Sequence, residues 1–248
     1  MADKKKSVLI TGAGRGLGRA CALKFAKEDY IVIINDIHSE SAYQVKKEVE
    51  SIHALADVMM GDVRDYRQME KICEKITAAY GTIDVLVNNA GIAIPGSLKF
   101  YGIDEWENIK AVNIIGVFNC TKAVLPHMIK QKSGVIVNFS SCITAYGSSH
   151  EIGYAVSKGV IDAFTKSLAK EVGKYNIRVN AVLPLILDTD MSQGFGERFL
   201  NSLAFVKKLA SLEHYISAAD VANAVFLLVS EEARFMTGKL LKVDAGAF

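Results

Sequence analysis

The stretch that decides the fold is Val8-Leu9-Ile10-Thr11-Gly12-Ala13-Gly14-Arg15-Gly16-Leu17-Gly18. Its apolar start has the character of a strand, and residues 17–27 after the glycines have helical periodicity. Glycines permit a sharp turn from strand to helix, and they let backbone N–H groups approach a pyrophosphate without Cβ atoms in the way. No Gly-Lys-Ser/Thr follows, which disfavours a nucleotide triphosphatase loop. We predict that this turn binds a dinucleotide through Gly12, Gly14, Arg15, Gly16, Leu17 and Gly18.

Short runs rich in Val and Ile recur along the rest of the chain. They predict seven strands, at about residues 7–10, 31–34, 58–60, 83–87, 134–139, 178–182 and 239–243. Segments of helical period lie between them, and this alternation predicts right-handed crossovers and a parallel sheet. The strands are almost continuously apolar, which is expected when helices cover both faces. We expect an α/β fold with one doubly wound Rossmann-type domain over residues 1–248.

The segment from about residue 190 to residue 217 does not have the pattern of a strand. We expect it to be a mobile lid or substrate loop, because long connections inside compact domains are usually functional. Its apolar side chains either face a bound substrate or pack against the body of the domain. They are Phe195, Phe199, Leu203 and Phe205.

Composition narrows the kinds of partner. The chain has 29 basic and 27 acidic side chains, so no broad field attracts nucleic acid or an anionic membrane. The apolar run after the basic N-terminus is too short for a signal peptide, and we find no run of about 20 apolar residues that would span a bilayer. We expect a soluble, cytoplasmic protein that recognises a small molecule.

The four cysteines do not predict a metal site. Cys21, Cys73, Cys120 and Cys142 lie far apart, without a C-x-x-C pair or a histidine at ligand spacing. We interpret them as buried free thiols. Cys142 lies beside candidate catalytic residues, where we expect a pocket-wall residue and not a nucleophile.

A carboxylate at the end of the second predicted strand bears on cofactor choice. Asp36 lies 18 residues after Gly18, where a carboxylate accepts hydrogen bonds from the adenosine ribose and repels a 2′-phosphate. Arg15 favours the opposite choice, because a guanidinium in the glycine turn can pair with that phosphate. We expect NAD, with NADP as the alternative.

Tyr154 and Lys158 are four residues apart in a segment of helical period, so they lie on one helix face. A nearby ammonium lowers the pKa of a tyrosine from about 10, and we expect Tyr154 to exchange a proton near neutral pH. Taken alone, the spacing is also typical of an ordinary pair on a surface helix.

Further motifs favour a functional role for Tyr154 and Lys158 over an ordinary pair on a surface helix. Asp62 follows the third predicted strand, Asn88-Asn89-Ala90-Gly91 the fourth and Ser140-Ser141 the fifth, and Asn113 lies in a predicted long helix. With the glycine turn, they make the chain resemble the short-chain dehydrogenase/reductase family over essentially its whole length. The resemblance implies hydride transfer between a nicotinamide cofactor and a carbonyl or secondary alcohol.

The resemblance also implies individual roles. Ser141, thirteen residues before the tyrosine, polarises the substrate carbonyl and is preferred to its neighbour Ser140. Tyr154 transfers the proton, and Lys158 tunes Tyr154 and holds the nicotinamide ribose. Asn113 anchors a water in the proton relay.

Other residues are implied to hold the cofactor. Asp62 and Val63 would frame the adenine, and Asn89, Ala90 and Gly91 would lie along the cofactor, whereas Asn88 would stabilise the end of the sheet. At the nicotinamide end the implied residues are Pro184, the Leu187 backbone and the Thr189 hydroxyl.

Three positions depart from the family's usual pattern. Leu185 replaces a usual glycine, so we expect a displaced loop or a narrowed pocket. Thr144 and Ala245 also stand where glycine is common. Leu185 is the main support for another hypothesis, a nucleotide-binding regulator without catalytic activity.

Among family branches, the chain most resembles the 3-oxoacyl-carrier-protein reductases. An NAD-dependent secondary-alcohol or hydroxysteroid-type dehydrogenase is the alternative, because Asp36 argues against NADPH. Lys130, Lys132 and Lys174 either contribute to a docking patch for a carrier protein or are ordinary surface lysines. The candidate pocket is mostly apolar, which suits an acyl chain or a steroid-like ring. Its members are Ile92, Ala93, Ile94, Cys142, Thr144, Tyr146, His150, Leu185 and Ile186.

The resemblance implies an assembly as well. The family commonly forms tetramers by pairing long helices and C-terminal strands, and we expect a homotetramer. Apolar residues in 219–229 and the run Ala245-Gly246-Ala247-Phe248 could supply such contacts.

Overall fold

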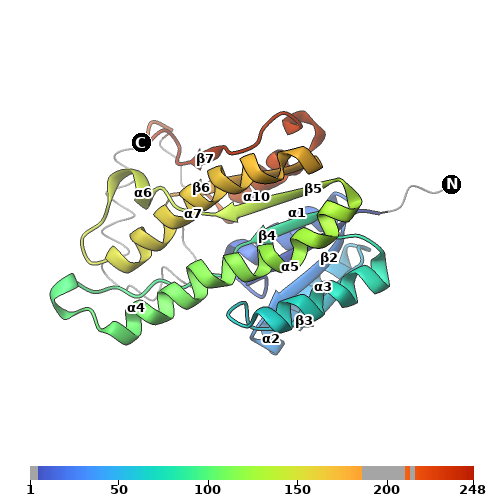
Figure 1. Ribbon diagram of the computed structural model, residues 1–248, viewed down its shortest axis with the longest axis horizontal. Helices are drawn as coiled ribbons and strands as arrows, with labels where there is room; N and C mark the ends of the chain where they lie inside the picture. Colours follow the sequence, from blue (N-terminus) through green and yellow to red (C-terminus); the bar gives the residue numbers. More distant parts are fainter. Residues whose placement is uncertain (1–4, 186–209, 213–215) are drawn as a thin grey trace.

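A seven-stranded parallel sheet forms the centre of the protein (Figure 1). The structure, a computed structural model, describes residues 5–185, 210–212 and 216–248. The strands are β1 (Ser7–Thr11), β2 (Ile31–Asp36), β3 (Ala56–Met60), β4 (Val85–Asn88), β5 (Gly134–Phe139), β6 (Ile177–Pro184) and β7 (Leu240–Val243). Their order is β3-β2-β1-β4-β5-β6-β7, and every neighbouring pair is parallel. The predicted doubly wound Rossmann-type fold is confirmed.

Two sets of helices cover the two faces of the sheet. One face carries α1 (Gly16–Lys27), α2 (Ser39–Ser51) and α10 (Ala218–Val229), and the other α3 (Tyr66–Tyr80), α5 (Gly116–Gln131) and α7 (Ile152–Val172). Successive strand residues point to opposite faces, so Val8 and Ile10 join one buried core and Leu9 joins the other. This is why the strands are almost continuously apolar.

A long helix runs from Ile103 to Gln131, and a π-helical segment interrupts it. The parts are α4 (Ile103–Ile109), η2 (Lys110–Ile115) and α5. Among the described residues, this is the one helix that is long and apolar enough to cross a membrane. Half of that apolar window is buried inside the domain, where Cys120 and Val124 belong to the second core.

Four shorter elements complete the described fold. They are η1 (Leu98–Phe100), α6 (Ile143–Tyr146), η3 (Gly173–Tyr175) and η4 (Glu231–Ala233). Most of the expected substrate loop, residues 190–209 and 213–215, lies outside the described residues.

One strand begins later than predicted, at a residue whose backbone pairs with a side chain. We predicted a strand from residue 83, but β4 begins at Val85. The Gln131 side chain accepts from the Ile83 N–H at 3.0 Å and donates to its carbonyl at 3.1 Å. The Ile83 backbone is therefore paired with a side chain. Hydrogen bonds to the neighbouring strands begin at Asp84, whose N–H donates to the Ser7 carbonyl and whose carbonyl accepts from the Val135 N–H.

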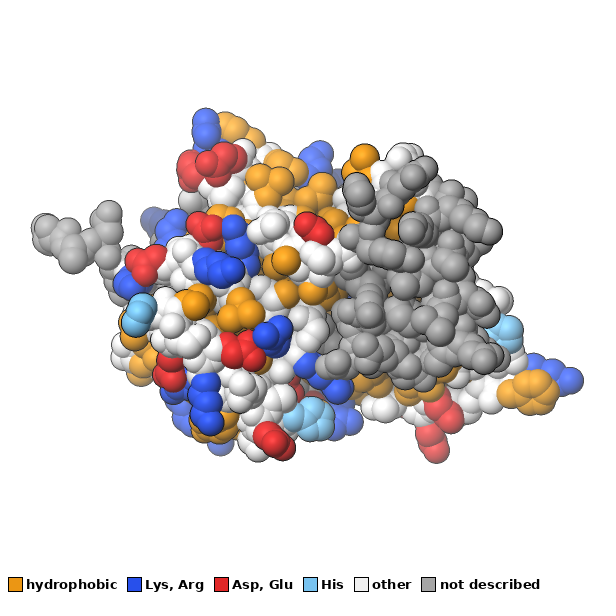
Figure 2. All heavy atoms as spheres, turned by 180° about the vertical axis from the view of Figure 1, so that it is seen from behind, with side chains coloured by type: hydrophobic (Ala, Val, Ile, Leu, Met, Phe, Trp, Pro, Cys, Tyr) orange, Lys and Arg blue, Asp and Glu red, His pale blue; other side chains and the backbone are white. Residues whose placement is uncertain are grey.

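Charge is mixed on the face that lies behind the view of Figure 1. Figure 2 shows basic and acidic side chains interspersed with apolar ones over the described part of this face. That distribution agrees with the near balance of 29 basic and 27 acidic residues.

Candidate active site

The predicted site residues meet at the carboxyl ends of the strands. β1 lies between β2 and β4, so the chain reverses its winding direction beside β1. In doubly wound sheets, ligands bind in the crevice at such a switch point. The glycine turn follows β1, Asp36 ends β2, Asn89 follows β4 and Ser141 follows β5.

The glycine turn has little room for side chains. Gly12 has φ +61°, and a Cβ there would lie 2.9 Å from the Ala90 Cα. A Cβ at Gly18 would collide with the Gly12 carbonyl oxygen. Arg15 caps α1 in an extended conformation without a side-chain capping bond, which leaves the first N–H groups of the helix available to an anion. The turn therefore fits a pyrophosphate.

The loop after β4 is fastened to this turn. The Asn89 amide donates to the Thr11 and Gly12 carbonyls, each at 2.9 Å, and the Thr11 hydroxyl accepts from the N–H groups of Asn89 and Ala90 at 3.1 Å. Sequence reasoning missed the role of Thr11; the signal that the sequence offered was a hydroxyl residue directly before the first glycine. Asn88 donates to Asn138 on β5 and Thr121 on α5, as its predicted sheet-stabilising position implies.

Asp36 is buried against the glycine turn. Its side chain accepts from the Gly14 N–H at 2.8 Å and from the His38 N–H at 3.0 Å. Two backbone donors therefore fix a carboxylate where an adenosine ribose would lie in this kind of crevice.

The predicted adenine contacts lie at the end of β3. Asp62 is paired with Arg64, whose hydrogen bonds lower the pKa of that carboxyl. Val63 is buried, and Asn119 on α5 holds the carbonyls of Val63 and Arg64, each at 3.0 Å. Val63 is thus fixed in position from α5, whereas the Asp62 N–H donates to the Gln68 side chain on α3 at 3.0 Å.

Tyr154 and Lys158 project from one face of α7. The Lys158 Nζ lies 5.4 Å from the Tyr154 ring centroid and donates to the Phe139 carbonyl at 2.7 Å. Burial lowers the pKa of Lys158 to about 8, and the Asp162 charge opposes this shift. Burial also raises the pKa of Tyr154 to about 12, against a hydrogen bond with Ser141 that lowers it.

The expectation that Lys158 lowers the pKa of Tyr154 is therefore wrong for the chain alone. The Lys158 ammonium is held by a backbone carbonyl, and desolvation of the Tyr154 phenol is the larger effect. Helical spacing places the two side chains together, but it does not reveal how far each is buried.

The two neighbouring serines differ in their surroundings. Ser140 is buried and donates to the Lys158 carbonyl at 3.3 Å. Ser141 is partly accessible, its hydroxyl accepts from the Ile143 N–H at 3.2 Å, and its side chain lowers the pKa of Tyr154 against the larger effect of burial. Of the two, Ser141 is thus the one that faces the tyrosine, as predicted.

Asn113 lies in the π-helical segment, a deviation that often occurs at functional sites. Its amide group accepts from the Ile92 N–H at 2.8 Å and donates to the Ile92 carbonyl and to the Ser157 hydroxyl. Ser157 in turn donates to the Tyr154 carbonyl at 2.7 Å. A Cβ at Gly91 would lie 3.4 Å from the Asn113 Oδ1 and 3.7 Å from the Lys158 Nζ, so these residues form one cluster.

The burial of Leu185 shows where its bulky side chain goes. Its side chain packs with Cys142 and Leu183 in a small third core, and its N–H donates to the Val243 carbonyl at 3.1 Å. The Pro184 carbonyl accepts from the Cys142 N–H, and burial raises the pKa of the Cys142 thiol to about 12. Cys142 and Leu185 are thus core residues and not open pocket walls. Leu187, Thr189 and Ile186 lie outside the described residues.

The other predicted pocket positions remain near the surface. Ile92, Ala93, Ile94 and Thr144 are half-buried, and His150 is exposed on its loop. Tyr146 stacks on Phe248, with ring centroids 4.5 Å apart.

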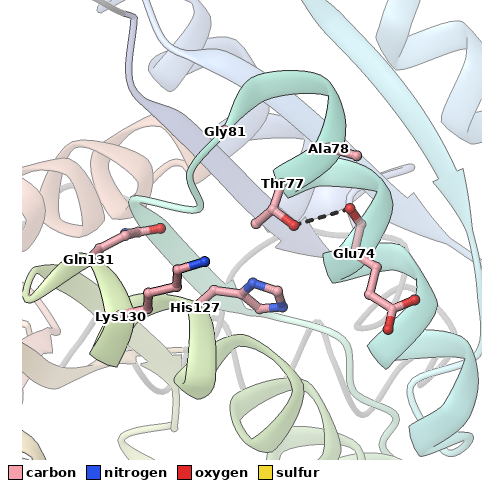
Figure 3. Close-up of a pocket in the computed structure, with 7 residues that line it drawn as sticks. All are labelled: Glu74, Thr77, Ala78, Gly81, His127, Lys130 and Gln131. Carbon is pink, nitrogen blue, oxygen red and sulfur yellow. Dashed lines mark hydrogen bonds between the residues drawn. The ribbon is translucent and has the colours of Figure 1, made fainter.

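A separate groove of about 560 Å³ lies between α3 and α5 (Figure 3). It is lined by Glu74, Thr77, Ala78, Gly81, His127, Lys130 and Gln131. Gly81 precedes β4 and Gln131 precedes β5, so the groove is at the amino ends of the strands, opposite the predicted site. Lys130 lines it, which places this lysine away from the catalytic cluster.

Known proteins are similar to this chain in both sequence and architecture. Residues 6–198 match the family model described as short chain dehydrogenase. The chain belongs to the short-chain dehydrogenase family. It is 38% identical over 241 residues to the 3-oxoacyl-[acyl-carrier-protein] reductase FabG of Thermotoga maritima, covering 97% of each chain. It is 34% identical over 246 residues to a 3alpha-hydroxysteroid dehydrogenase of Mediterraneibacter gnavus, covering 98% of this chain and 97% of that protein.

Solved structures of the family have the same fold. Levodione reductase superposes with a TM-score of 0.91 at 30% identity, covering 97% of this chain and 96% of that one. A short-chain dehydrogenase/reductase from Burkholderia xenovorans superposes with a TM-score of 0.92 at 31% identity, covering 98% and 96%. The protein is thus an NAD(P)-dependent oxidoreductase of the short-chain dehydrogenase family, which acts on C=O and CH–OH groups.

Proposed function

We propose that Tyr154 is the proton-transfer residue of this oxidoreductase, with Ser141, Lys158 and Asn113 completing the catalytic group. The observation that carries the proposal is the cluster itself: the Lys158 Nζ lies 5.4 Å from the Tyr154 ring centroid, and the Asn113 amide reaches the Tyr154 carbonyl through the Ser157 hydroxyl. The Tyr154 phenol donates its proton to a carbonyl oxygen during reduction and takes the alcohol proton during oxidation. Ser141 orients that oxygen. When bound, the nicotinamide supplies or accepts the hydride.

The described residues offer a surface that suits such a cofactor. The glycine turn and the start of α1 would hold the pyrophosphate, and Asp36 the adenosine ribose. Asp62 and Val63 would border the adenine, and the backbone from Asn89 to Gly91 would lie along the cofactor. Lys158 would bind the nicotinamide ribose. Pro184, together with Leu187 and Thr189 from outside the described residues, would hold the carboxamide. This part of the proposal rests on the tight glycine turn and its free helix N-terminus.

We propose NAD as the preferred cofactor, because Asp36 is buried and held by two N–H groups in the crevice. Asp36→Ala is expected to shift the ratio of kcat/KM for NADH to that for NADPH at least about tenfold toward NADPH, because the repulsion of a 2′-phosphate is lost. Steady-state kinetics with both cofactors measures this ratio. Asp29→Ala, which removes an exposed carboxylate paired with Lys5, is the control and should leave the ratio unchanged. An unchanged ratio in Asp36→Ala would refute the ribose assignment.

For the substrate, we propose a 3-oxoacyl thioester or the corresponding hydroxy compound, supported by the 38% identity to a 3-oxoacyl-[acyl-carrier-protein] reductase. The second candidate is a hydroxysteroid, supported by the similarity to the 3alpha-hydroxysteroid dehydrogenase. The segment at about 190–217 would supply much of the pocket in either case. Absorbance at 340 nm, with each cofactor form offered against acetoacetyl thioesters, steroids and simple secondary alcohols, separates the two candidates. Turnover of steroids alone would exclude the thioester proposal.

The regulator hypothesis is weakened by the position of Leu185. Its side chain packs in the third core. It therefore does not fill the space in front of Tyr154 and Lys158, and the main reason to expect a protein without catalytic activity is removed.

We also propose a cytoplasmic homotetramer. All four cysteines are free thiols, as is usual in a reducing compartment. An apolar stripe of Ile115, Phe118, Val156 and Val160 remains between 39% and 48% exposed on η2, α5 and α7. Paired copies of these helices would cover it.

Phe118→Glu is expected to break this pairing, because it places a charge in an apolar interface. Size-exclusion chromatography with light scattering should then report a smaller assembly than the unaltered protein. Ile52→Glu, at an exposed position after α2, is the control and should keep the full mass. A full-sized Phe118→Glu protein would mean that this stripe is not the contact.

A further inference from the structure

We propose that Gly14 is a positioning residue for cofactor selection: its lack of a side chain lets the Asp36 carboxylate lie against the glycine turn in the orientation that accepts NAD. The proposal deepens the proposed NAD preference and rests on it. Gly14 differs in this respect from Gly12 and Gly18, whose need for glycine is explained by the turn itself.

The first observation is that the carboxylate is held on both oxygens. Oδ2 accepts from the Gly14 N–H at 2.8 Å, and Oδ1 accepts from the His38 N–H at 3.0 Å. One donor belongs to the turn after β1 and the other to the turn after β2, so the carboxylate links two loops. Asp36 is only 8% exposed, so the two turns enclose the carboxylate that they hold.

The second observation is the space around Gly14. A Cβ at this position would lie 2.5 Å from the Ser41 Oγ and 2.8 Å from the Asp36 Oδ2. Both distances are shorter than van der Waals contact, and both atoms are the ends of side chains that can rotate. An added methyl group would therefore displace the carboxylate without breaking the turn.

The backbone at Gly14 does not itself demand glycine. Gly12 and Gly16 have positive φ values, +61° and +54°, whereas the φ of Gly14 is not positive. Alanine is then compatible with the main chain, and its effect at Gly14 comes from the contacts of its Cβ. This makes the position suitable for a clean test.

The neighbouring Arg15 gives the direction of the expected change. Its side chain is exposed and makes no capping hydrogen bond to α1. Once the Asp36 carboxylate has moved, a 2′-phosphate meets less repulsion, and the guanidinium can pair with it. Gly14→Ala should therefore weaken NADH binding and relieve the rejection of NADPH.

The experiment is a double-mutant cycle on cofactor affinity, measured by nicotinamide fluorescence with the full-length protein. The four proteins are the unaltered chain, Gly14→Ala, Asp36→Ala and the double variant. We expect Gly14→Ala to reduce the ratio of the NADPH Kd to the NADH Kd by about tenfold, the worth of one charge-assisted hydrogen bond. In the Asp36→Ala background the same change should leave that ratio unaltered, because the carboxylate is already gone.

Gly173→Ala is the matched control, because nothing lies within 4 Å of a Cβ there. If Gly14→Ala proves unstable by thermal melting, Gly14→Ala combined with Ser41→Ala removes the Ser41 contact and should show the same loss of selectivity. An unchanged Kd ratio in Gly14→Ala, or an equal change with and without Asp36, overturns the positioning role. If instead Asp36→Ala alone does not alter the ratio, the proposed NAD preference itself fails and the role of Gly14 falls with it.

Discussion

Tyr154→Phe is expected to reduce turnover by about 10²- to 10⁴-fold, the usual contribution of a positioned general acid or base. The change removes one hydroxyl and keeps the ring beside Lys158. Cofactor binding should persist, because the glycine turn and Asp36 are untouched. Single-turnover kinetics and fluorescence titration measure the two properties separately. Retained activity above about a tenth of the original would refute the proton-transfer role.

The raised pKa of Tyr154 predicts how the rates of oxidation and reduction depend on pH. With a pKa of about 12, the free chain carries a protonated phenol at neutral pH, which suits donation of a proton to a carbonyl. Oxidation needs the deprotonated form, so its rate should rise with pH where reduction does not. Tyr43→Phe, on the exposed side of α2, is the control and should leave both profiles unaltered.

The fold could be predicted because the pattern of apolar residues along the sequence is regular. Apolar runs in β1, β2 and β5 alternate with amphipathic helices, and only a parallel sheet with two covered faces accommodates them. Ends of elements were less predictable, because they depend on side chains from elsewhere in the chain. Gln131 lies 48 residues from Ile83, and its side chain still pairs with both the N–H and the carbonyl of that residue.

The candidate site was predictable in its members but not in its energetics. The order of motifs indicated Ser141, Tyr154 and Lys158, and the structure brings these three together. The spacing of Tyr154 and Lys158 did not reveal that burial raises one pKa and lowers the other. Thr11 was missed, because its two backbone donors come from a loop 78 and 79 residues away.

The surroundings of Leu185 also could not be predicted from the sequence. In the sequence it is a bulky residue in place of a usual glycine, which suggested a narrowed pocket. Its actual neighbours, Cys142 and Leu183, come from two different segments, and their packing directs the side chain into the core. Only the three-dimensional arrangement distinguishes these outcomes.

Lys158→Met is expected to inactivate the enzyme and at the same time to stabilise the free chain near neutral pH. The pKa of Lys158 falls from 10.5 to about 8 on folding, so the folded protein binds the proton less well than the unfolded chain does. Below pH 8 this costs about 3 kcal/mol of stability. Methionine removes that cost but leaves the Phe139 carbonyl without its donor, worth about 1 kcal/mol, so the net gain is about 2 kcal/mol.

The sign of the pH dependence tests this account. Between pH 8 and about 10 the unfolded chain holds the Lys158 proton and the folded chain releases it, so the stability of the unaltered protein should rise with pH. Above pH 10 the raised pKa of Tyr154 acts in the opposite direction. Urea unfolding at pH 7 and pH 9.5 measures both proteins, with Lys166→Met, on an exposed part of α7, as the control. If Lys158→Met is less stable than the parent at pH 7, the lysine is not held at a cost, and burial does not set its pKa. If the variant is more stable and inactive, the Lys158 ammonium lowers the stability of the protein and is required for its activity.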